Sequence, residues 1–190
     1  LQRKKIMAIR EKIIGFIYGV VTGSKRYRRL LTPLFALVFF SIVLMLILGS
    51  FLIDRFLGLP RFLSMPWSMA MSMPFLVIGG FMWLWSAGIF FQTKGTPVPV
   101  NPPPKLVTNG PYAYSRNPMM TGLFMVVAGI GIFFGSVTLT FIMTPLFVVM
   151  SILEFKYIEE PELMKRFGQE YIEYRKRTPI IIPKIWNPKM

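Results

Sequence analysis

The sequence predicts an all-α integral membrane protein with four to five transmembrane helices and a C-terminal amphipathic helix. Hydrophobic residues make up 54% of the 190 residues and charged residues 16%, a balance typical of membrane proteins. Three stretches contain no charged residue, namely 30–53, 62–93 and 117–153. A bilayer core requires about 20 apolar residues per helix, so each stretch is long enough to cross it. The length suits a single membrane domain, 1–190.

The first 29 residues predict an amphipathic helix at the membrane surface. They carry nine basic residues and one acidic residue, and apolar residues recur at helical spacing between Ile6 and Val20. Charged residues at 10–12 interrupt this apolar run, which favours an interfacial helix over a spanning one. A tilted fifth span is the alternative.

Region 30–92 is predicted to hold the first two spans. Leu30–Ile53 is the first span, and the charged residues within 54–61 mark the turn that follows it. Two prolines, Pro66 and Pro74, divide the next apolar stretch. We therefore expect Phe62–Met73 to be an interfacial lead-in and Pro74–Phe91 to be the second span.

Region 93–190 combines a loop, a helical hairpin and a C-terminal helix, and we expect it to be the catalytic region. Five prolines between 97 and 104 exclude a helix in the loop. The aromatic pair Tyr112 and Tyr114 favours an ordered lid or binding loop over a disordered linker. The hairpin, Asn117–Leu153, is long enough for two short spans, with a turn at Gly135 and a kink at Pro145.

The hairpin is followed by two adjacent acids, Glu159 and Glu160, and then by Pro161. Proline favours the first turn of a new helix, so we expect the chain to break at the two acids. A second helix would then run from Pro161 to about Lys176. Its apolar face would consist of Leu163, Phe167, Tyr171 and Tyr174.

The basic residues indicate the topology and the kind of partner. Of the 22 basic residues, 20 lie in 1–29, in the 92–117 loop or after the hairpin, and two lie in the 54–61 turn. By the positive-inside rule, both termini and the loop face the cytoplasm. The basic residues flank apolar runs and form no single stripe, which favours an anionic lipid surface and argues against nucleic acid.

The chain contains neither cysteine nor histidine. Disulfide and thiolate chemistry are therefore excluded, and no metal site is predicted, since only carboxylates remain as strong ligands. A general base would have to be a Glu, Asp, Tyr or Lys side chain.

The loop and the acid pair can each bind part of a zwitterionic ligand. Arg116 is a fork-shaped donor suited to a carboxylate or phosphate, and the loop tyrosines offer π faces that attract cations, including a sulfonium. Glu159 or Glu160 would bind an ammonium group. A ligand with an amino-acid moiety would then fit between Glu on one wall and Arg116 on the other. Alternatively, Arg116 is a membrane collar residue and the tyrosines belong to the interfacial belt.

Three short motifs carry a family resemblance. They are Gly110-Pro111-Tyr112, the run Arg116-Asn117-Pro118 up to Gly122, and Glu159-Glu160 beyond a hydrophobic hairpin. This pattern resembles the isoprenylcysteine carboxyl methyltransferase and phospholipid methyltransferase superfamily. The resemblance implies a membrane-embedded methyltransferase that uses S-adenosyl-L-methionine, releases S-adenosyl-L-homocysteine and acts on a lipophilic or prenylated acceptor. It further implies a prokaryotic plasma-membrane protein whose C-terminal helix closes a cytosolic cofactor pocket.

The candidate site residues follow from these motifs and their neighbours. The candidate cofactor-binding residues are Lys105, Val107, Gly110, Pro111, Tyr112, Tyr114, Arg116, Asn117, Pro118, Met120, Gly122, Glu159 and Glu160. The candidate catalytic residues are Arg116, Asn117, Glu160 and Arg175, where Arg175 would attract an anionic acceptor or would equally serve as a collar residue.

One departure from the family pattern bears on the acceptor, because Asn117 stands where the family has histidine. An amide does not titrate, so a proton-transfer role at this position is in doubt. Methyl transfer from a sulfonium requires alignment and dehydration more than acid–base help, and a carboxylate acceptor is already ionised at neutral pH. The sequence therefore favours a carboxylate. An NADPH-dependent reductase of the sterol-reductase type and a non-enzymatic membrane protein are the alternatives.

Overall fold

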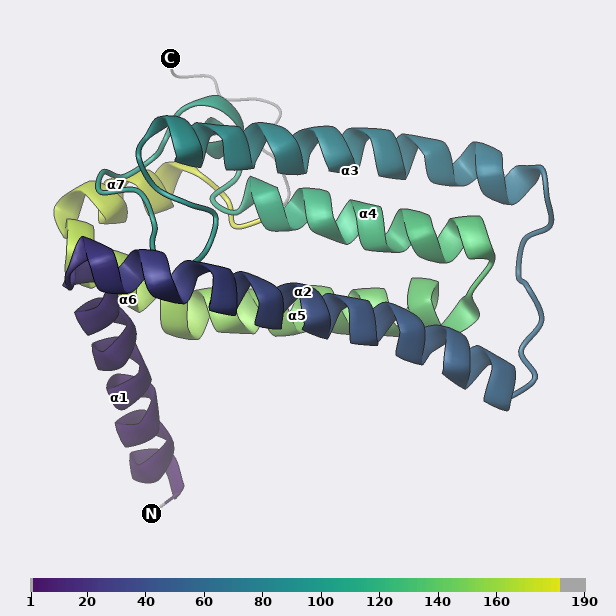
Figure 1. Cartoon of the computed structure of the whole chain (residues 1–190), viewed down its shortest axis with the longest axis horizontal. Coiled ribbons are helices and arrows are strands. Elements are labelled where there is room, and N and C mark those ends of the chain that lie inside the picture. Colours follow the sequence, from purple (N-terminus) through teal and green to yellow (C-terminus); the bar gives the residue numbers. More distant parts are fainter. Residues whose placement is uncertain (1, 182–190) are drawn as a thin grey trace.

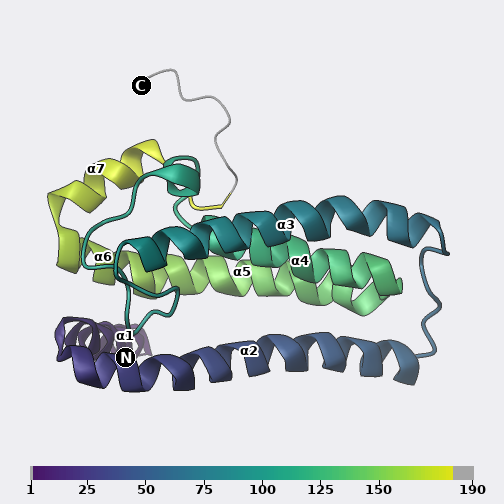
Figure 2. The ribbon, with the colours of Figure 1, turned by 45° about the horizontal axis from the view of Figure 1, so that its top comes forward.

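The computed structural model describes residues 2–181, which form helices joined by loops (Figure 1). The α-helices are α1 Gln2–Thr22, α2 Lys25–Phe56, α3 Trp67–Gln92, α4 Pro118–Phe134, α5 Thr144–Glu154, α6 Glu160–Phe167 and α7 Gln169–Arg177. One 3₁₀-helix, η1, spans Gly110–Ala113, and two π-helical segments, η2 Thr138–Met143 and η3 Phe155–Glu159, flank α5. Helices α2 to α5 run side by side as a bundle in both views (Figures 1 and 2).

Three of the described helices are long and apolar enough to cross a membrane, namely Lys25–Phe56, Trp67–Gln92 and the continuous helix Thr138–Phe167. Helix α4 is apolar but shorter, with 17 residues. The prediction of an all-α integral membrane protein is therefore confirmed, with three candidate spans and one shorter apolar helix. Helix α1 is not among the candidates, and it leaves the end of the bundle at a large angle to α2 (Figure 1).

Glycines let the backbones of α3 and α4 meet directly. A Cβ added at Gly79 would lie 2.7 Å from the carbonyl oxygen of Gly122, and one added at Gly122 would lie 2.6 Å from that of Gly79. Small residues at facing positions are the usual means of close packing between membrane helices. This contact therefore fixes the position of α4 along the axis of α3. It also fixes the end of the loop that precedes α4.

The second span differs from the prediction. Helix α3 begins at Trp67 and continues through Pro74, so Phe62–Met73 is not an interfacial lead-in. A proline within a membrane helix removes one backbone hydrogen bond, which neighbouring helices and serine side chains can offset.

The break expected at Glu159-Glu160 is also misplaced. The helix runs on from α5 through η3 into α6, and the chain turns only at Gly168, with φ 56° and ψ −127°. Glycine alone adopts this backbone conformation readily. The wider π-helical turn lies directly before Pro161, and Pro145 likewise follows η2, so an irregular helix does occur at both prolines.

At the end of the bundle away from α6 and α7, Asp54 ties α2 to the hairpin. Its carboxylate accepts hydrogen bonds from the Ser136 hydroxyl and, at 3.0 Å, from the Thr138 amide. The predicted turn at Gly135 is confirmed, since this residue has φ 65° and ends α4. The opposite end of the bundle carries α1, α6, α7 and the 93–117 loop (Figure 1).

Candidate active site

The 93–117 loop is ordered, as its aromatic pair predicts, and it is anchored on α3. Gly110 has φ 59°, and a Cβ there would lie 2.5 Å from Ile89, so the loop backbone presses directly against α3. The ring of Tyr112 is buried and stacks on Phe90, with centroids 5.0 Å apart and planes at 12°. These contacts orient η1 at the end of the bundle.

The C-terminal segment after α7 crosses the loop and binds its backbone. The amides of Arg116 and Asn117 donate to the carbonyls of Pro179 and Ile180 at 2.8 and 3.0 Å. The Ser115 hydroxyl also donates to the Ile180 carbonyl, at 2.9 Å. Because α7 lies between Gly168 and this segment, it is fixed at both ends.

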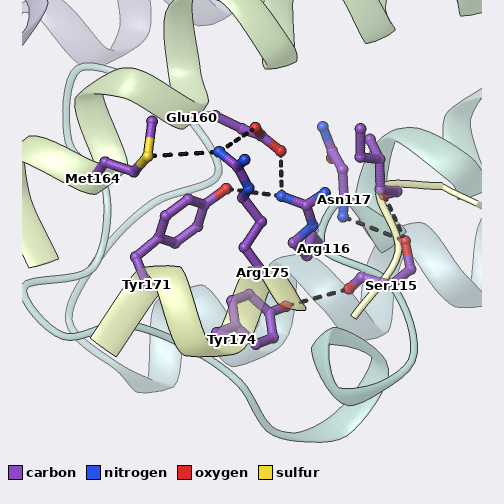
Figure 3. A network of polar contacts seen from close by, with 9 residues as sticks. Ser115, Arg116, Asn117, Glu160, Met164, Tyr171, Tyr174 and Arg175 are labelled. Atoms are coloured by element: carbon purple, nitrogen blue, oxygen red, sulfur yellow. Dashed lines mark hydrogen bonds and ion pairs between the residues drawn. The ribbon is translucent and has the colours of Figure 1, made fainter. Parts of the chain in front are cut away.

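Arg116 and Glu160 form a buried ion pair between the loop and α6 (Figure 3). Only 7% of the Arg116 side chain and 6% of the Glu160 side chain are exposed. Arg116 also donates to the Tyr171 hydroxyl at 3.3 Å. Arg175 reaches the other oxygen of Glu160 at 3.4 Å, but 46% of its side chain is exposed.

This ion pair corrects one expectation from the sequence. Arg116 and Glu160 were expected on opposite walls, each binding one end of a zwitterionic ligand, whereas they contact each other directly. The loop and the acid pair do meet on one side of the bundle, as expected. Of the two acids, Glu159 is the one that lines the adjacent cavity.

The cavity lies between the loop, α6 and α7, and it encloses about 480 Å³ including its open mouth. Its lining combines aromatic rings with basic and acidic side chains. The lining residues are Phe90, Pro102, Pro103, Lys105, Leu106, Val107, Tyr112, Arg116, Phe155, Glu159, Leu163, Arg166, Phe167, Tyr171 and Tyr174.

Five of the candidate cofactor-binding residues line the cavity, and these are Lys105, Val107, Tyr112, Arg116 and Glu159. The others lie outside the lining. Those outside are Gly110, Pro111, Tyr114, Asn117, Pro118, Met120, Gly122 and Glu160.

Two of the motif residues form the first turn of α4. Asn117 is its N-cap, and its side-chain oxygen accepts a hydrogen bond from the Met120 amide at 3.3 Å. Pro118 follows in the first helical turn. A backbone N–H at this position would have no carbonyl partner within the helix, so its absence in proline costs no hydrogen bond. The side-chain amide of Asn117 therefore stabilises the first turn of α4, and Asn is among the residues preferred at this N-cap position.

The C-terminal helices contribute lining residues that the list of candidates omits. Leu163, Phe167, Tyr171 and Tyr174 were expected as one apolar helix face, and all four line the cavity. Their spacing therefore contained the signal, but it was assigned to packing. Phe90 and Phe155 were missed because single aromatic residues within apolar spans cannot be distinguished from core residues.

The tyrosine hydroxyls of the site remain protonated at neutral pH. Burial, followed by the nearby charge of Glu160, raises the pKa of Tyr171 to about 12. Burial also raises the pKa of Tyr112 and of Tyr174 above the ordinary value. These phenols therefore act as hydrogen-bond donors and π faces, and none is poised as a general base.

We expect Tyr174→Phe to loosen the loop. The Tyr174 hydroxyl is buried and donates to the Tyr112 carbonyl at 2.6 Å, so its loss leaves that carbonyl unpaired. The expected loss in the free energy of unfolding is about 1–2 kcal/mol. Chemical denaturation in detergent measures it, with Tyr114→Phe as control, since Tyr114 is 41% exposed. Equal stability of the two variants would show that the hydrogen bond does not support the loop.

Comparison with known proteins places this site in a family. Residues 53–170 match the model of the family described as phospholipid methyltransferase. Over 86 residues the chain is 37% identical to the protein-S-isoprenylcysteine O-methyltransferase of Schizosaccharomyces pombe, covering 42% of this chain and 34% of that protein. Over 81 residues it is 32% identical to the nickel-cobalt-cadmium resistance protein NccN of Alcaligenes xylosoxydans xylosoxydans, covering 43% of this chain and 37% of that protein.

A solved structure shares the fold. It is that of a eukaryotic intramembrane Ras methyltransferase, isoprenylcysteine carboxyl methyltransferase, with a TM-score of 0.55 and 25% sequence identity, covering 77% of this chain and 52% of that one. The chain thus spans about a third to a half of the length of these relatives. The matched region includes the loop, the hairpin and the acid pair, while Tyr171 and Tyr174 of the cavity lining lie just beyond it. The resemblance stated from the motifs is therefore confirmed: the chain belongs to the phospholipid methyltransferase family, a family of membrane methyltransferases that depend on S-adenosylmethionine.

Proposed function

We propose that this chain transfers the methyl group of S-adenosyl-L-methionine to a lipophilic, membrane-borne acceptor, and that the accepting group is a carboxylate, as in a prenylated cysteine. One observation carries this proposal. The motif loop and the helix with the acid pair meet around an aromatic-lined cavity at one end of a bundle of apolar helices. A polar cofactor and an apolar acceptor can both reach such a position.

The residues of the cavity fit the cofactor. The rings of Tyr112, Phe155 and Tyr171 line it and would attract the sulfonium through their π faces. The carboxylate of Glu159 would bind the ammonium group of the amino-acid moiety, and Lys105 would bind its carboxylate. When bound, the cofactor supplies an electrophilic methyl group, and the chain holds and dehydrates the reactants.

The charges around Glu160 support an anionic acceptor. Two arginines, Arg116 and Arg175, share this single carboxylate, so one positive charge is left over. It lies at the half-exposed side chain of Arg175, beside the buried pair. A positive charge at a partly exposed position attracts an anion without a full desolvation cost. An ionised carboxylate needs no base, which suits a chain without histidine.

The family match favours methyl transfer over the NADPH-dependent reductase and over a non-enzymatic role. The site would face the cytoplasm, because the end of the bundle that carries the loop, α1 and α7 also holds most basic residues. Both the orientation and the prokaryotic plasma membrane remain part of the proposal.

The acceptor is tested with radiolabelled S-adenosylmethionine and the protein in bilayers. We expect label to enter an S-prenylated cysteine with a free carboxylate, and neither its methyl ester nor phosphatidylethanolamine. Arg175→Gln should raise KM for the acceptor about tenfold while leaving the affinity for S-adenosylhomocysteine unchanged. Labelling of phosphatidylethanolamine in place of the prenylated carboxylate would refute the proposed acceptor.

A further inference from the structure

Helix α1 is joined to the helix that carries the acid pair. The Arg10 Nε donates to the carbonyl oxygen of Tyr157 at 2.7 Å, and the guanidinium also lies 5.9 Å from the centroid of the Tyr157 ring. Further along, Lys165 of α6 lies over the ring of Tyr18 at 4.2 Å. Helix α1 therefore contacts both η3 and α6, on either side of Glu159 and Glu160.

Pro161 leaves the turn before it short of one backbone donor. Proline has no N–H, so it cannot donate to a carbonyl of the preceding π-helical segment, which ends at Glu159. Arg10 donates to one carbonyl of this segment, that of Tyr157. A residue of α1 therefore holds the backbone two residues before Glu159.

A second face of α1 has no partner among the described residues. It holds Ile9, Ile13 and Phe16, which are 51%, 39% and 62% exposed and recur at helical spacing. Exposed Lys5 and Lys12 lie along the same side, whereas Glu11, the one acidic residue of the helix, points about half a turn away. We call Ile9, Ile13 and Phe16 the exposed apolar stripe.

We propose that the exposed apolar stripe docks on an anionic membrane surface and that Arg10 transmits this docking to the acid pair, so that cofactor binding depends on anionic lipid. This inference rests on the proposed function. An apolar stripe bordered by lysines is typical of interfacial helices, and anionic leaflets attract such basic segments. When the bundle crosses a bilayer along its length, the large angle between α1 and the bundle would lay α1 along the membrane surface (Figures 1 and 2).

Hydrogen exchange tests the coupling without any ligand. The full chain is placed in nanodiscs of phosphatidylcholine alone or with added phosphatidylglycerol. In anionic discs we expect the amides of η3 and α6 to exchange at least fivefold more slowly than in neutral discs. Phe16→Asp, which disrupts the stripe, and Arg10→Gln, which removes the Tyr157 contact, should each abolish this difference. Met7→Asp is the matched control, since Met7 is 54% exposed on another side of α1.

Titration with S-adenosylhomocysteine in the same discs separates the two proposals. We expect at least fivefold tighter binding in anionic discs for the wild type and for Met7→Asp, and no difference for Phe16→Asp or Arg10→Gln. Absence of binding in both discs would refute the proposed function, while lipid-dependent exchange would still support the coupling of α1 to the acid pair. Hydrogen-exchange rates and an affinity for S-adenosylhomocysteine that are the same in neutral and anionic discs would overturn the inference. A change of oligomeric state in Phe16→Asp, with lipid dependence intact, would overturn it too, by assigning the stripe to a second copy of the chain.

Discussion

Glu160→Ala is expected to lower the free energy of unfolding by about 3–5 kcal/mol, because it leaves the Arg116 guanidinium buried without its partner. The Arg116 side chain is only 7% exposed, so water cannot replace the lost carboxylate. Arg175→Ala should cost less than about 1 kcal/mol, since that arginine is 46% exposed and solvent weakens its ion pair. Denaturant titration in detergent, with reversibility checked, measures both changes.

The double variant Arg116→Met with Glu160→Leu separates stability from function. Replacing both partners of a buried ion pair with apolar residues is often neutral, so we expect most of the lost stability to return. Binding of S-adenosylhomocysteine should not return, because the Arg116 side chain lines the cavity. A double variant as unstable as Glu160→Ala would mean that the ion pair is not the source of the loss.

Gly79→Val is expected to force helices α3 and α4 apart. Its Cβ would lie 2.7 Å from the Gly122 carbonyl oxygen and from the Met125 Cβ, so α3 and α4 must separate. We expect a loss of about 3 kcal/mol or more, at the upper end of overpacking effects in protein cores. The displacement would also move the start of α4, so S-adenosylhomocysteine binding should weaken as well.

The neighbouring glycine provides a matched control for this variant. A Cβ at Gly80 meets nothing within 4 Å, so Gly80→Val should leave stability unchanged or raise it slightly through helix propensity. Thermal unfolding of the two variants in the same detergent gives the comparison. Equal melting temperatures for Gly79→Val and Gly80→Val would contradict the close α3–α4 packing.

Composition and uncharged runs were sufficient to predict the membrane class and the approximate helices. The first span, the ordered loop and the turn at Gly135 all follow from charge and from backbone preferences that act locally. For Arg116 and Glu160, the sequence could predict only that both residues lie on the same side of the membrane. Their direct contact depends on how α6 packs against the loop, which no local pattern specifies.

The errors in helix boundaries share one physical cause. Proline predicts a helix break reliably in water, but a membrane bundle offers the freed backbone groups other partners. Pro74 therefore lies inside α3, and Pro161 continues α5 after a π-helical turn. The actual break is at Gly168, where a positive φ is needed and the sequence shows only a single glycine.

Titration of the purified wild type with S-adenosylhomocysteine, beside Glu160→Ala and the double variant of Arg116 and Glu160, tests the central claim most directly. The proposal predicts saturable binding to the wild type and at least tenfold weaker binding to both variants, with the double variant still folded. A folded wild type that binds no S-adenosylhomocysteine in detergent or in anionic bilayers would contradict it.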